Sequence, residues 1–464
     1  MEMTGRDVDY EGLLKRALKN GGDFSELFVE HRRGTSVSSE ARRIEKYLES
    51  EESGAGLRVV VGDRQAYAYT NDFSSLDELA DTVASAVRKG AFDGALRLEK
   101  RAPRSMNLLG TDPLGVDPAR KIDAVARAEK AAWGHDPSVI QARVMYGDGV
   151  RHVVIANSKG FLVEDRRDSL IFVVQGVVKG DSLVETGYEP VGGARGFELL
   201  DEDPPEAVAG RALARALQTV RARKAPAGSM PVVLSSEAGG TMVHEAIGHG
   251  LEADLAGEGL SVYSGLIGTR VATDAITVVD DGSLPGLRGS MGYDDEGSPT
   301  ERTVLVDKGI LKTYLTDFVT SLKFGLPLSG NGRRESFRNR PIPRMTNTLI
   351  LPGTMAPEEV VSRVDRGVFV RKMGGGQVNT VNGDFVFNIA EGYLIEGGQV
   401  GEPIRGATLI GNGPKILMSI DLVGSDLGFG IGTCGKDGQG APVADAQPTL
   451  LIPDITVGGE IGGS

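Results

Sequence analysis

The sequence predicts an α+β protein with two N-terminal α+β domains followed by a large β-rich C-terminal domain. Three observations lead to this prediction. The 464 residues are too many for one hydrophobic core. Apolar residues in the first half alternate between helical and strand-like spacing. In the second half, short apolar segments are separated by glycine. Glycine supplies 65 of the 464 residues of the whole chain, about twice its usual share of ~7%.

Residues 1–92 form the first predicted α+β domain. Helical spacing of apolar residues over residues 8–20 predicts a helix that ends at Asn20-Gly21-Gly22. A second helix is predicted over residues 77–89, so the helices should cover one side of an antiparallel sheet. The predicted strands between them are residues 25–31, 34–48, 56–62 and 64–70.

Residues 93–116, which contain two prolines and several charges, are interpreted as a linker to a central α+β domain at residues 117–224. This domain repeats the order helix, strands, helix, although the two domains do not align residue by residue. The turn Asn157-Ser158-Lys159-Gly160 predicts a hairpin. The predicted helices are residues 118–133 and 205–223, and the predicted strands are 139–146, 151–156 and 161–178.

Residues 225–464 form the predicted C-terminal domain. A short strand, residues 231–234, leads into one helix that carries His244. Glycine-bounded segments then recur, which indicates a sandwich or a barrel-like sheet with this helix laid on it. These segments are residues 276–279, 303–306, 311–315, 349–351, 367–370, 384–389, 392–395, 408–411 and 450–452.

Charge and hydropathy restrict the class of protein. The formal net charge is −13, which disfavours nucleic acid as the main partner because phosphate contacts need basic surface. Residues 1–7 lack the apolar core of a signal peptide. The longest mostly apolar run, residues 170–178, is far shorter than the ~20 residues of a membrane span. We therefore expect a cytoplasmic protein without a membrane partner.

The segment His244-Glu245-Ala246-Ile247-Gly248-His249 contains two of the five histidines, with a glutamate beside the first. Imidazole is a common zinc ligand, and a neighbouring carboxylate is where metalloproteases keep their general base. Residues five apart lie roughly 140° apart on a regular α-helix, so one ion cannot bind both rings there. A ligand pair requires either an i→i+5 turn or the end of the helix, and Gly248 permits both. Spacing alone equally allows two histidines on a helix that frays.

Cys434 is the only cysteine, so intrachain disulfides and cysteine-rich zinc sites are excluded. A lone cysteine is most often a small buried apolar residue. Its glycine-rich surroundings also suit a thiolate that joins two imidazoles in a catalytic set of three ligands. Sequence spacing does not show whether Cys434 and His244 meet.

Four stretches make the chain similar to the TldD/PmbA metallopeptidases. The resemblance covers nearly the whole chain and implies that His244, His249 and Cys434 bind Zn²⁺ while Glu245 acts as the general base. The intact histidine motif resembles the catalytic TldD branch, whose relatives in the other branch lack it. The stretches are His244-Glu245-Ala246-Ile247-Gly248-His249, Gly330-Asn331-Gly332-Arg333-Arg334-Glu335-Ser336, residues 383–393 and Gly432-Thr433-Cys434-Gly435-Lys436-Asp437-Gly438-Gln439.

The resemblance also implies partners and substrates. Members of the family work as dimers, so the partner would be an identical chain or a paralogue without the motif. They cleave unfolded or leader-type peptides at the end of an internal channel. Two other functions stay open from the sequence: a peptide-binding or chaperone-like protein with a structural zinc, and a zinc hydrolase of a small amide.

Further residues carry weaker hypotheses. The segment Phe385, Val386, Phe387, Asn388 would offer a strand edge to an extended peptide, or be an interior strand. Glu252 and Asp254 would accept a histidine N–H, or lie in solvent. Further candidates are Tyr293 with Asp294-Asp295-Glu296 as a channel entrance or a solvated loop, and Arg333 with Arg334 as a peptide carboxylate site or as structural ion pairs.

Overall fold

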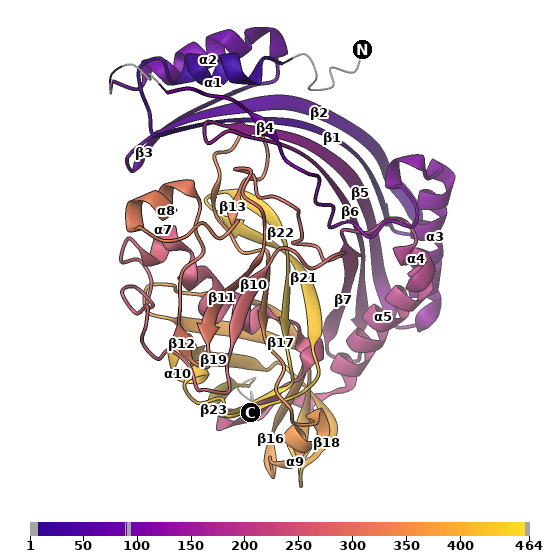
Figure 1. Cartoon of the computed structure of the whole chain (residues 1–464). Coiled ribbons are helices and arrows are strands. Elements are labelled where there is room, and N and C mark those ends of the chain that lie inside the picture. Colours follow the sequence, from indigo (N-terminus) through magenta and orange to yellow (C-terminus); the bar gives the residue numbers. More distant parts are fainter. Residues whose placement is uncertain (1–7, 89, 91–93, 460–464) are drawn as a thin grey trace.

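The computed structural model describes residues 8–88, 90 and 94–459 (Figure 1). Three predictions reach beyond these residues. Residue 89, the last of one predicted helix, lies outside them, as does the domain boundary at residues 92–93. The terminal residues 1–7 and 460–464 of the outer predicted domains also lie outside.

The described strands of the two predicted N-terminal domains join one sheet, together with β4 from the predicted linker. The order is β3-β2-β1-β5-β6-β4, with β7 also paired to β6. Strands β1 and β5 are antiparallel neighbours from the pair Glu26–Asn157 to the pair Glu40–Arg143. The boundaries are β1 (Phe24–Glu40), β2 (Arg43–Val61), β3 (Arg64–Thr70), β4 (Glu99–Lys100), β5 (Val139–Asn157), β6 (Phe161–Lys179) and β7 (Val184–Gly193). The two segments therefore share a sheet while keeping separate helices.

These helices cover the two ends of the curved sheet, which arches over the C-terminal domain (Figure 1). One pair packs in a core cluster with Leu27 and Leu57, and the other pair in a cluster with Tyr146 and Phe172. The first pair is α1 (Tyr10–Ala17) and α2 (Leu76–Ser85), and the second is α3 (Pro118–His135) and α5 (Pro205–Arg221), with the short α4 (Leu199–Glu202) beside it.

The predicted strand at residues 34–48 is wrong, because the chain reverses within it. Ala41 and Arg42 form the turn between β1 and β2 with positive φ angles of 53° and 67°. Neither residue is a glycine or an asparagine, so the sequence carried no ordinary turn signal. The predicted hairpin at residues 157–160 is confirmed, since Asn157 pairs with Phe161 where β5 meets β6.

The C-terminal domain contains a ring of strands, as expected for a barrel-like sheet. In the described chain, neighbouring strands follow the order β16-β9-β23-β19-β17, and an additional pairing of β16 with β17 closes the ring. Strands β18, β8 and β20 extend it. The boundaries are β8 (Arg223–Lys224), β9 (Gly228–Leu234), β16 (Arg366–Val378), β17 (Asp384–Glu396), β18 (Gln399–Arg405), β19 (Thr408–Asn412), β20 (Leu422–Val423) and β23 (Leu450–Gly458).

A second C-terminal sheet has the order β12-β11-β10-β15-β22-β21 in the described chain. Its boundaries are β10 (Val278–Asp281), β11 (Arg302–Asp307), β12 (Ile310–Leu311), β15 (Asn347–Ile350), β21 (Gly428–Lys436) and β22 (Gln439–Gln447). The smaller elements are β13 (Gly332–Arg333), β14 (Ile342–Pro343), α7 (Ala253–Ala256), α8 (Phe318–Phe324), α9 (Pro357–Ser362) and α10 (Gly413–Leu417). One apolar core joins the ring to this sheet, and it includes Val243, Ile247 and Cys434.

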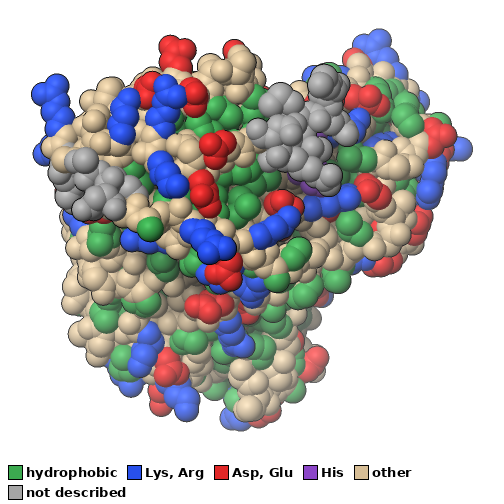
Figure 2. All heavy atoms as spheres, turned by 45° about the horizontal axis from the view of Figure 1, so that its top comes forward, with side chains coloured by type: hydrophobic (Ala, Val, Ile, Leu, Met, Phe, Trp, Pro, Cys, Tyr) green, Lys and Arg blue, Asp and Glu red, His purple; other side chains and the backbone are tan. Residues whose placement is uncertain are grey.

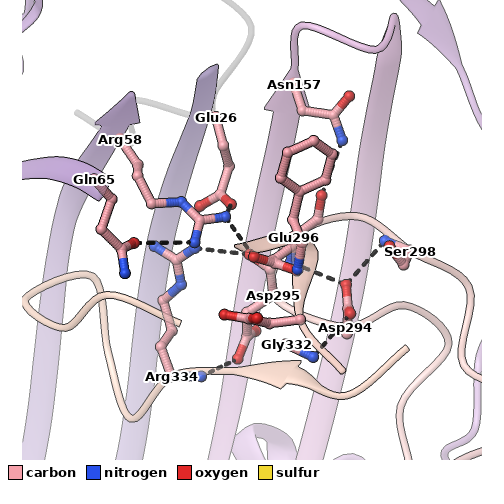
Figure 3. Close-up of polar contacts among 12 residues, drawn as sticks. Glu26, Arg58, Gln65, Asn157, Asp294, Asp295, Glu296, Ser298, Gly332 and Arg334 are labelled. Carbon is pink, nitrogen blue, oxygen red and sulfur yellow. Dashed lines mark hydrogen bonds and ion pairs between the residues drawn. The ribbon is translucent and has the colours of Figure 1, made fainter. Parts of the chain in front are cut away.

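A buried ionic cluster fastens the N-terminal sheet to the C-terminal domain (Figure 3). Arg58 on β2 donates to Glu26 on β1 at 2.7 Å and also to Glu296 of the C-terminal domain. Arg334 donates to Glu26 and, at 2.9 Å, to the carbonyl oxygen of Asp295. Arg58 and Glu26 are fully buried.

The acidic run Asp294-Asp295-Glu296 is therefore neither a channel entrance nor a solvated loop, and both predictions are wrong. Its three side chains are at most 2% exposed. Arg58 and Arg167 of the N-terminal sheet donate to Glu296 and Asp295. Asp294 instead accepts from the backbone N–H groups of Glu296, Ser298 and Gly332. Tyr293 is also buried, and its hydroxyl donates to the carbonyl oxygen of Ala102 at 2.7 Å.

The surface is mixed in charge on the face shown in Figure 2, where acidic and basic side chains lie among apolar ones. This face does not present the continuous basic field that nucleic-acid contact requires. Within the described residues, every helix is too short or too polar to cross a membrane.

Candidate metal centre

The two motif histidines lie on a helical segment that changes its winding. It begins as α6 (Thr241–Val243), becomes a π-helical turn (His244–Gly248) and ends as a 3₁₀ turn (His249–Leu251). The backbone N–H of His249 donates to the carbonyl oxygen of His244, which is the i→i+5 bond of a π turn. Of the two backbone arrangements that the spacing allows, the structure has the wide turn.

Packing explains why the wide turn fits at this place. A side chain on Gly248 would come within 2.2 Å of the Met345 sulfur, so only glycine allows the turn to lie so close. At the start of the segment, a Cβ on Gly240 would be 2.3 Å from the backbone nitrogen of Ala446. The apolar side chains of the segment, including Ile247, are buried in the core of the domain. The turn is thus held at one end against Met345, just before β15, and at the other end against β22.

The hairpin of β21 and β22 supplies Cys434. This residue pairs with Ala441 across the hairpin and is 5% exposed. The guanidinium of Arg344, itself buried, donates to the carbonyl oxygens of Cys434 and Gln439 and so fixes both strands near the tip. Neither strand was predicted. In β21, glycine at alternate positions hides the usual apolar alternation.

The three side chains converge on one point. Cys434 Sγ lies 3.3 Å from His249 Nε2. The ring centroids of His244 and His249 are 4.9 Å apart, and the two rings are nearly perpendicular. The potential ligand atoms of His244, His249 and Cys434 all lie within 4.8 Å of one another. One metal ion at ordinary N and S ligand distances of about 2.0–2.3 Å would be able to contact all three.

Two carboxylates set the orientation of the imidazoles. His244 Nδ1 lies 2.9 Å from Asp445 Oδ1, and His249 Nδ1 lies 2.9 Å from Glu252 Oε2. A proton on each Nδ1 satisfies these contacts and leaves each Nε2 for a ligand bond, as in the histidine–carboxylate pairs of zinc sites. The Glu252 hypothesis is thus met geometrically, whereas Asp445 was missed because a lone aspartate in a strand carries no signal. Asp254 contacts Lys436 instead.

Mutual electrostatics favour an ionised thiol. Burial raises the pKa of Cys434, but hydrogen bonding to His244 and His249 outweighs it and lowers the pKa to about 5. Burial lowers the pKa of His249, but Glu252 and Cys434 together raise it to about 10. The pKa of His244 is also raised, with Asp445 as the main opposing influence to burial. A thiolate facing two imidazoles in a dry site fits a divalent ion that accepts N and S ligands.

Glu245 lies on the π turn directly after His244 and is half-buried. Burial raises its pKa, while the charges of His244 and His249 act in the opposite direction. Its carboxyl is therefore close enough to His244 and His249 for electrostatic coupling.

For two other segments the structure supports the structural alternative, an interior strand at residues 385–388 and an ion pair at Arg334. Residues 385–388 do not present a strand edge, because β17 pairs there with β16 on one side and β19 on the other. Substrate contact by Phe385, Val386, Phe387 and Asn388 stays a prediction. Arg333 and Arg334 are buried, and their guanidinium groups contact acceptors of the protein itself. Arg333 donates to the carbonyl oxygens of Met345 and Pro442, and Arg334 belongs to the buried cluster of Figure 3.

Known proteins are similar to this chain in sequence. Family models described as PmbA/TldA metallopeptidase domain 1, central domain and C-terminal domain match residues 25–89, 111–220 and 227–459. A metalloprotease TldD homologue from Buchnera aphidicola is 33% identical over 452 residues, which cover 95% of this chain and 93% of that protein. A homologue of the same name from Haemophilus influenzae is 36% identical over 418 residues, covering 88% and 86%.

A solved structure of low sequence identity shares the fold of this chain. The crystal structure of a candidate DNA gyrase modulator from Thermotoga maritima has a TM-score of 0.77 at 22% identity, with 94% of this chain and 96% of that chain covered. Matches to all three family domains, together with relatives above 30% identity over most of the chain, determine the family. This chain belongs to the PmbA/TldD metallopeptidases.

Proposed function

We propose that this protein is a zinc-dependent metallopeptidase that hydrolyses peptide bonds in unfolded or unstructured peptides. The observation that carries the proposal is the convergence of His244, His249 and Cys434 beside Glu245. Zinc is the ion that best matches two imidazoles and one thiolate, because catalytic zinc sites use three such ligands and keep a fourth position open. Family membership supports peptide hydrolysis as the reaction.

The chain prepares the ligands before the ion arrives. Asp445 and Glu252 hold the Nδ1 protons, so both Nε2 atoms face the position between the histidines and Cys434. Zinc bound there would act as a Lewis acid on the peptide carbonyl and make a water molecule reactive near neutral pH. The buried surroundings strengthen the interaction of that charge with the reacting groups.

Glu245 transfers the protons of the reaction. Its carboxylate takes a proton from the attacking water and then delivers it to the leaving amine, which is general base and general acid catalysis by one group. Burial raises the pKa of Glu245 above its ordinary value, and a base whose pKa lies nearer to neutral pH transfers protons more effectively. Glu245 is not needed as a ligand, because the three other residues leave a position open.

The preference for unfolded peptides rests on the strand that carries Cys434. In the described chain, β21 is the end strand of its sheet and pairs with β22 on one side. An extended peptide is able to add to such an edge through main-chain hydrogen bonds, which demand little of its side chains. A folded substrate has its strands already paired. From the family resemblance we further propose a cytoplasmic dimer with an identical chain or a motif-less paralogue.

The test combines metal content with cleavage. Purified protein should contain about one zinc per chain. It should also degrade casein, an unfolded substrate, alone or with a co-encoded paralogue. Glu245→Gln should retain zinc and lose cleavage. Zinc with no cleavage of casein would indicate a binding protein with a structural metal, and cleavage confined to small amides would indicate the other hydrolase class.

A further inference from the structure

The metal ligands come from two separate parts of the chain, and contacts on both sides of the site join these parts. The helical segment supplies His244 and His249, while the β21–β22 hairpin supplies Cys434. On one side, His244 contacts Asp445 of β22. On the other side, Lys436 of β21 reaches back to the residues that follow His249.

Lys436 makes three polar contacts in a buried environment. Its Nζ lies 3.1 Å from Glu252 Oε2 and donates to Asp254 Oδ1 at 2.6 Å and to the carbonyl oxygen of Pro343 at 3.1 Å. The side chain is 9% exposed. Three partners hold this buried ammonium in a single position. A surface lysine differs, because its ion pair contributes little to stability.

Glu252 depends on this cation. Its residue is fully buried, and the same Oε2 that faces Lys436 lies 2.9 Å from His249 Nδ1. In the described structure, the other oxygen, Oε1, has no hydrogen-bond partner. Without Lys436, the carboxylate would keep only the hydrogen bond to His249, and a buried charge that loses its partner is driven to move. Such a movement releases the His249 ring.

We infer that Lys436 is a positioning residue for the metal site. By fixing Glu252, its ammonium aims His249 Nε2 at Cys434, which lies two residues before Lys436 on the same strand. The inference rests on the proposed metal-dependent function and deepens it, because Lys436 would set metal affinity without touching the ion. An ordinary structural ion pair would stabilise the fold and leave the ligand geometry unchanged.

A double-mutant cycle separates these two roles. The variants are Lys436→Met, which keeps side-chain length without charge, Glu252→Gln and the double variant. Zn²⁺ affinity of the metal-free full chain is measured by competition with a chromophoric chelator. Lys436→Met should bind Zn²⁺ on the order of 10- to 100-fold more weakly, as expected when a partner behind a ligand is lost. In the Glu252→Gln background, the same change should cost less than about three-fold, because coupled residues are non-additive.

Spectroscopy and a control lysine complete the test. Co²⁺ bound in place of Zn²⁺ reports ligand geometry, so its visible spectrum should change in Lys436→Met. Lys323→Met removes a lysine whose partner Glu258 is on the surface, and it should bind Zn²⁺ as wild type does. If Lys436→Met does not fold, Lys436→Gln takes its place and should show the same loss.

Two results would overturn the inference: wild-type affinity in Lys436→Met, or an equal loss in both backgrounds with an unchanged Co²⁺ spectrum. A wild-type protein that binds no Zn²⁺ would instead overturn the proposed function, on which the inference depends.

Discussion

The backbone N–H of His249 donates to the carbonyl oxygen of His244, five residues earlier, and the centroids of the two imidazole rings are 4.9 Å apart. On a regular α-helix the same two residues would point in directions roughly 140° apart. The π turn therefore brings two residues whose spacing is wrong for an α-helix to the same face of the segment. It also places Glu245 within the wide turn, directly after His244.

Gly248→Ala should disrupt the metal site. The new methyl would meet the Met345 sulfur at 2.2 Å, so the turn must move or the core must give way. Overpacking of this kind typically costs about 1–3 kcal/mol. We expect a lower free energy of unfolding and weaker zinc binding, measured by urea titration and chelator competition. Gly435→Ala is the matched control, since open space surrounds that position next to Cys434. Equal behaviour of the two variants would refute the packing argument.

Asp445→Asn should weaken zinc binding on the order of 10- to 100-fold. The carboxylate contacts His244 Nδ1 at 2.9 Å, and an amide that turns its N–H₂ toward the ring would favour the wrong tautomer. Zinc affinity by chelator competition measures the effect. Asp437→Asn, at the exposed hairpin tip, serves as the control and should bind zinc normally. Undiminished binding in Asp445→Asn would show that His244 needs no such partner.

Zinc binding near pH 7 should release protons from the histidines. In the metal-free protein the pKa of His249 is raised to about 10 and that of His244 is also raised, so both rings are protonated at pH 7. The pKa of Cys434 is lowered to about 5, so the thiol has already lost its proton. Binding requires neutral imidazoles, and zinc affinity should therefore fall as pH falls, by roughly ten-fold per released proton and pH unit.

Isothermal titration calorimetry in buffers of different ionisation enthalpy counts these protons. Release of about two protons per zinc at pH 7 is the expected result. A binding enthalpy that does not change with the buffer would mean that both imidazoles are neutral before zinc arrives.

Arg58→Met should destabilise the contact between the N-terminal sheet and the C-terminal domain. The change leaves Glu26 and Glu296 buried with one cation fewer, and breaking such a buried pair typically costs about 3–5 kcal/mol. Urea unfolding measures the loss. Arg127→Met, which removes an exposed pair with Glu206, should cost less than about 1 kcal/mol. Similar losses in the two variants would argue that the buried cluster contributes no more than a surface pair.

The sequence predicted those parts of the site that depend on short-range spacing. Two histidines five apart and a neighbouring glutamate already required an unusual turn, and the π turn meets that requirement. Cys434 was a candidate because of its residue type and the family resemblance. Its approach to His249 depends on tertiary packing across a sequence separation of 185 positions, which local spacing does not encode.

The fold was predictable where apolar residues repeat regularly and unpredictable where pairing partners are distant. The helices at residues 10–17 and 118–135 follow amphipathic patterns that one segment contains. The pairing of β1 with β5, which merges two predicted domains into one sheet, involves residues more than a hundred positions apart. The burial of Asp295 has the same origin, because its arginine partner Arg167 lies on β6, 128 positions earlier in the sequence.

Zinc K-edge X-ray absorption of the purified protein tests the central claim most directly. We expect about one zinc per chain, with one sulfur ligand at about 2.3 Å and two histidine nitrogens at about 2.0–2.1 Å. The sulfur signal should disappear in Cys434→Ser. A zinc shell without sulfur in the wild-type protein would contradict the assignment of His244, His249 and Cys434 as the ligand set.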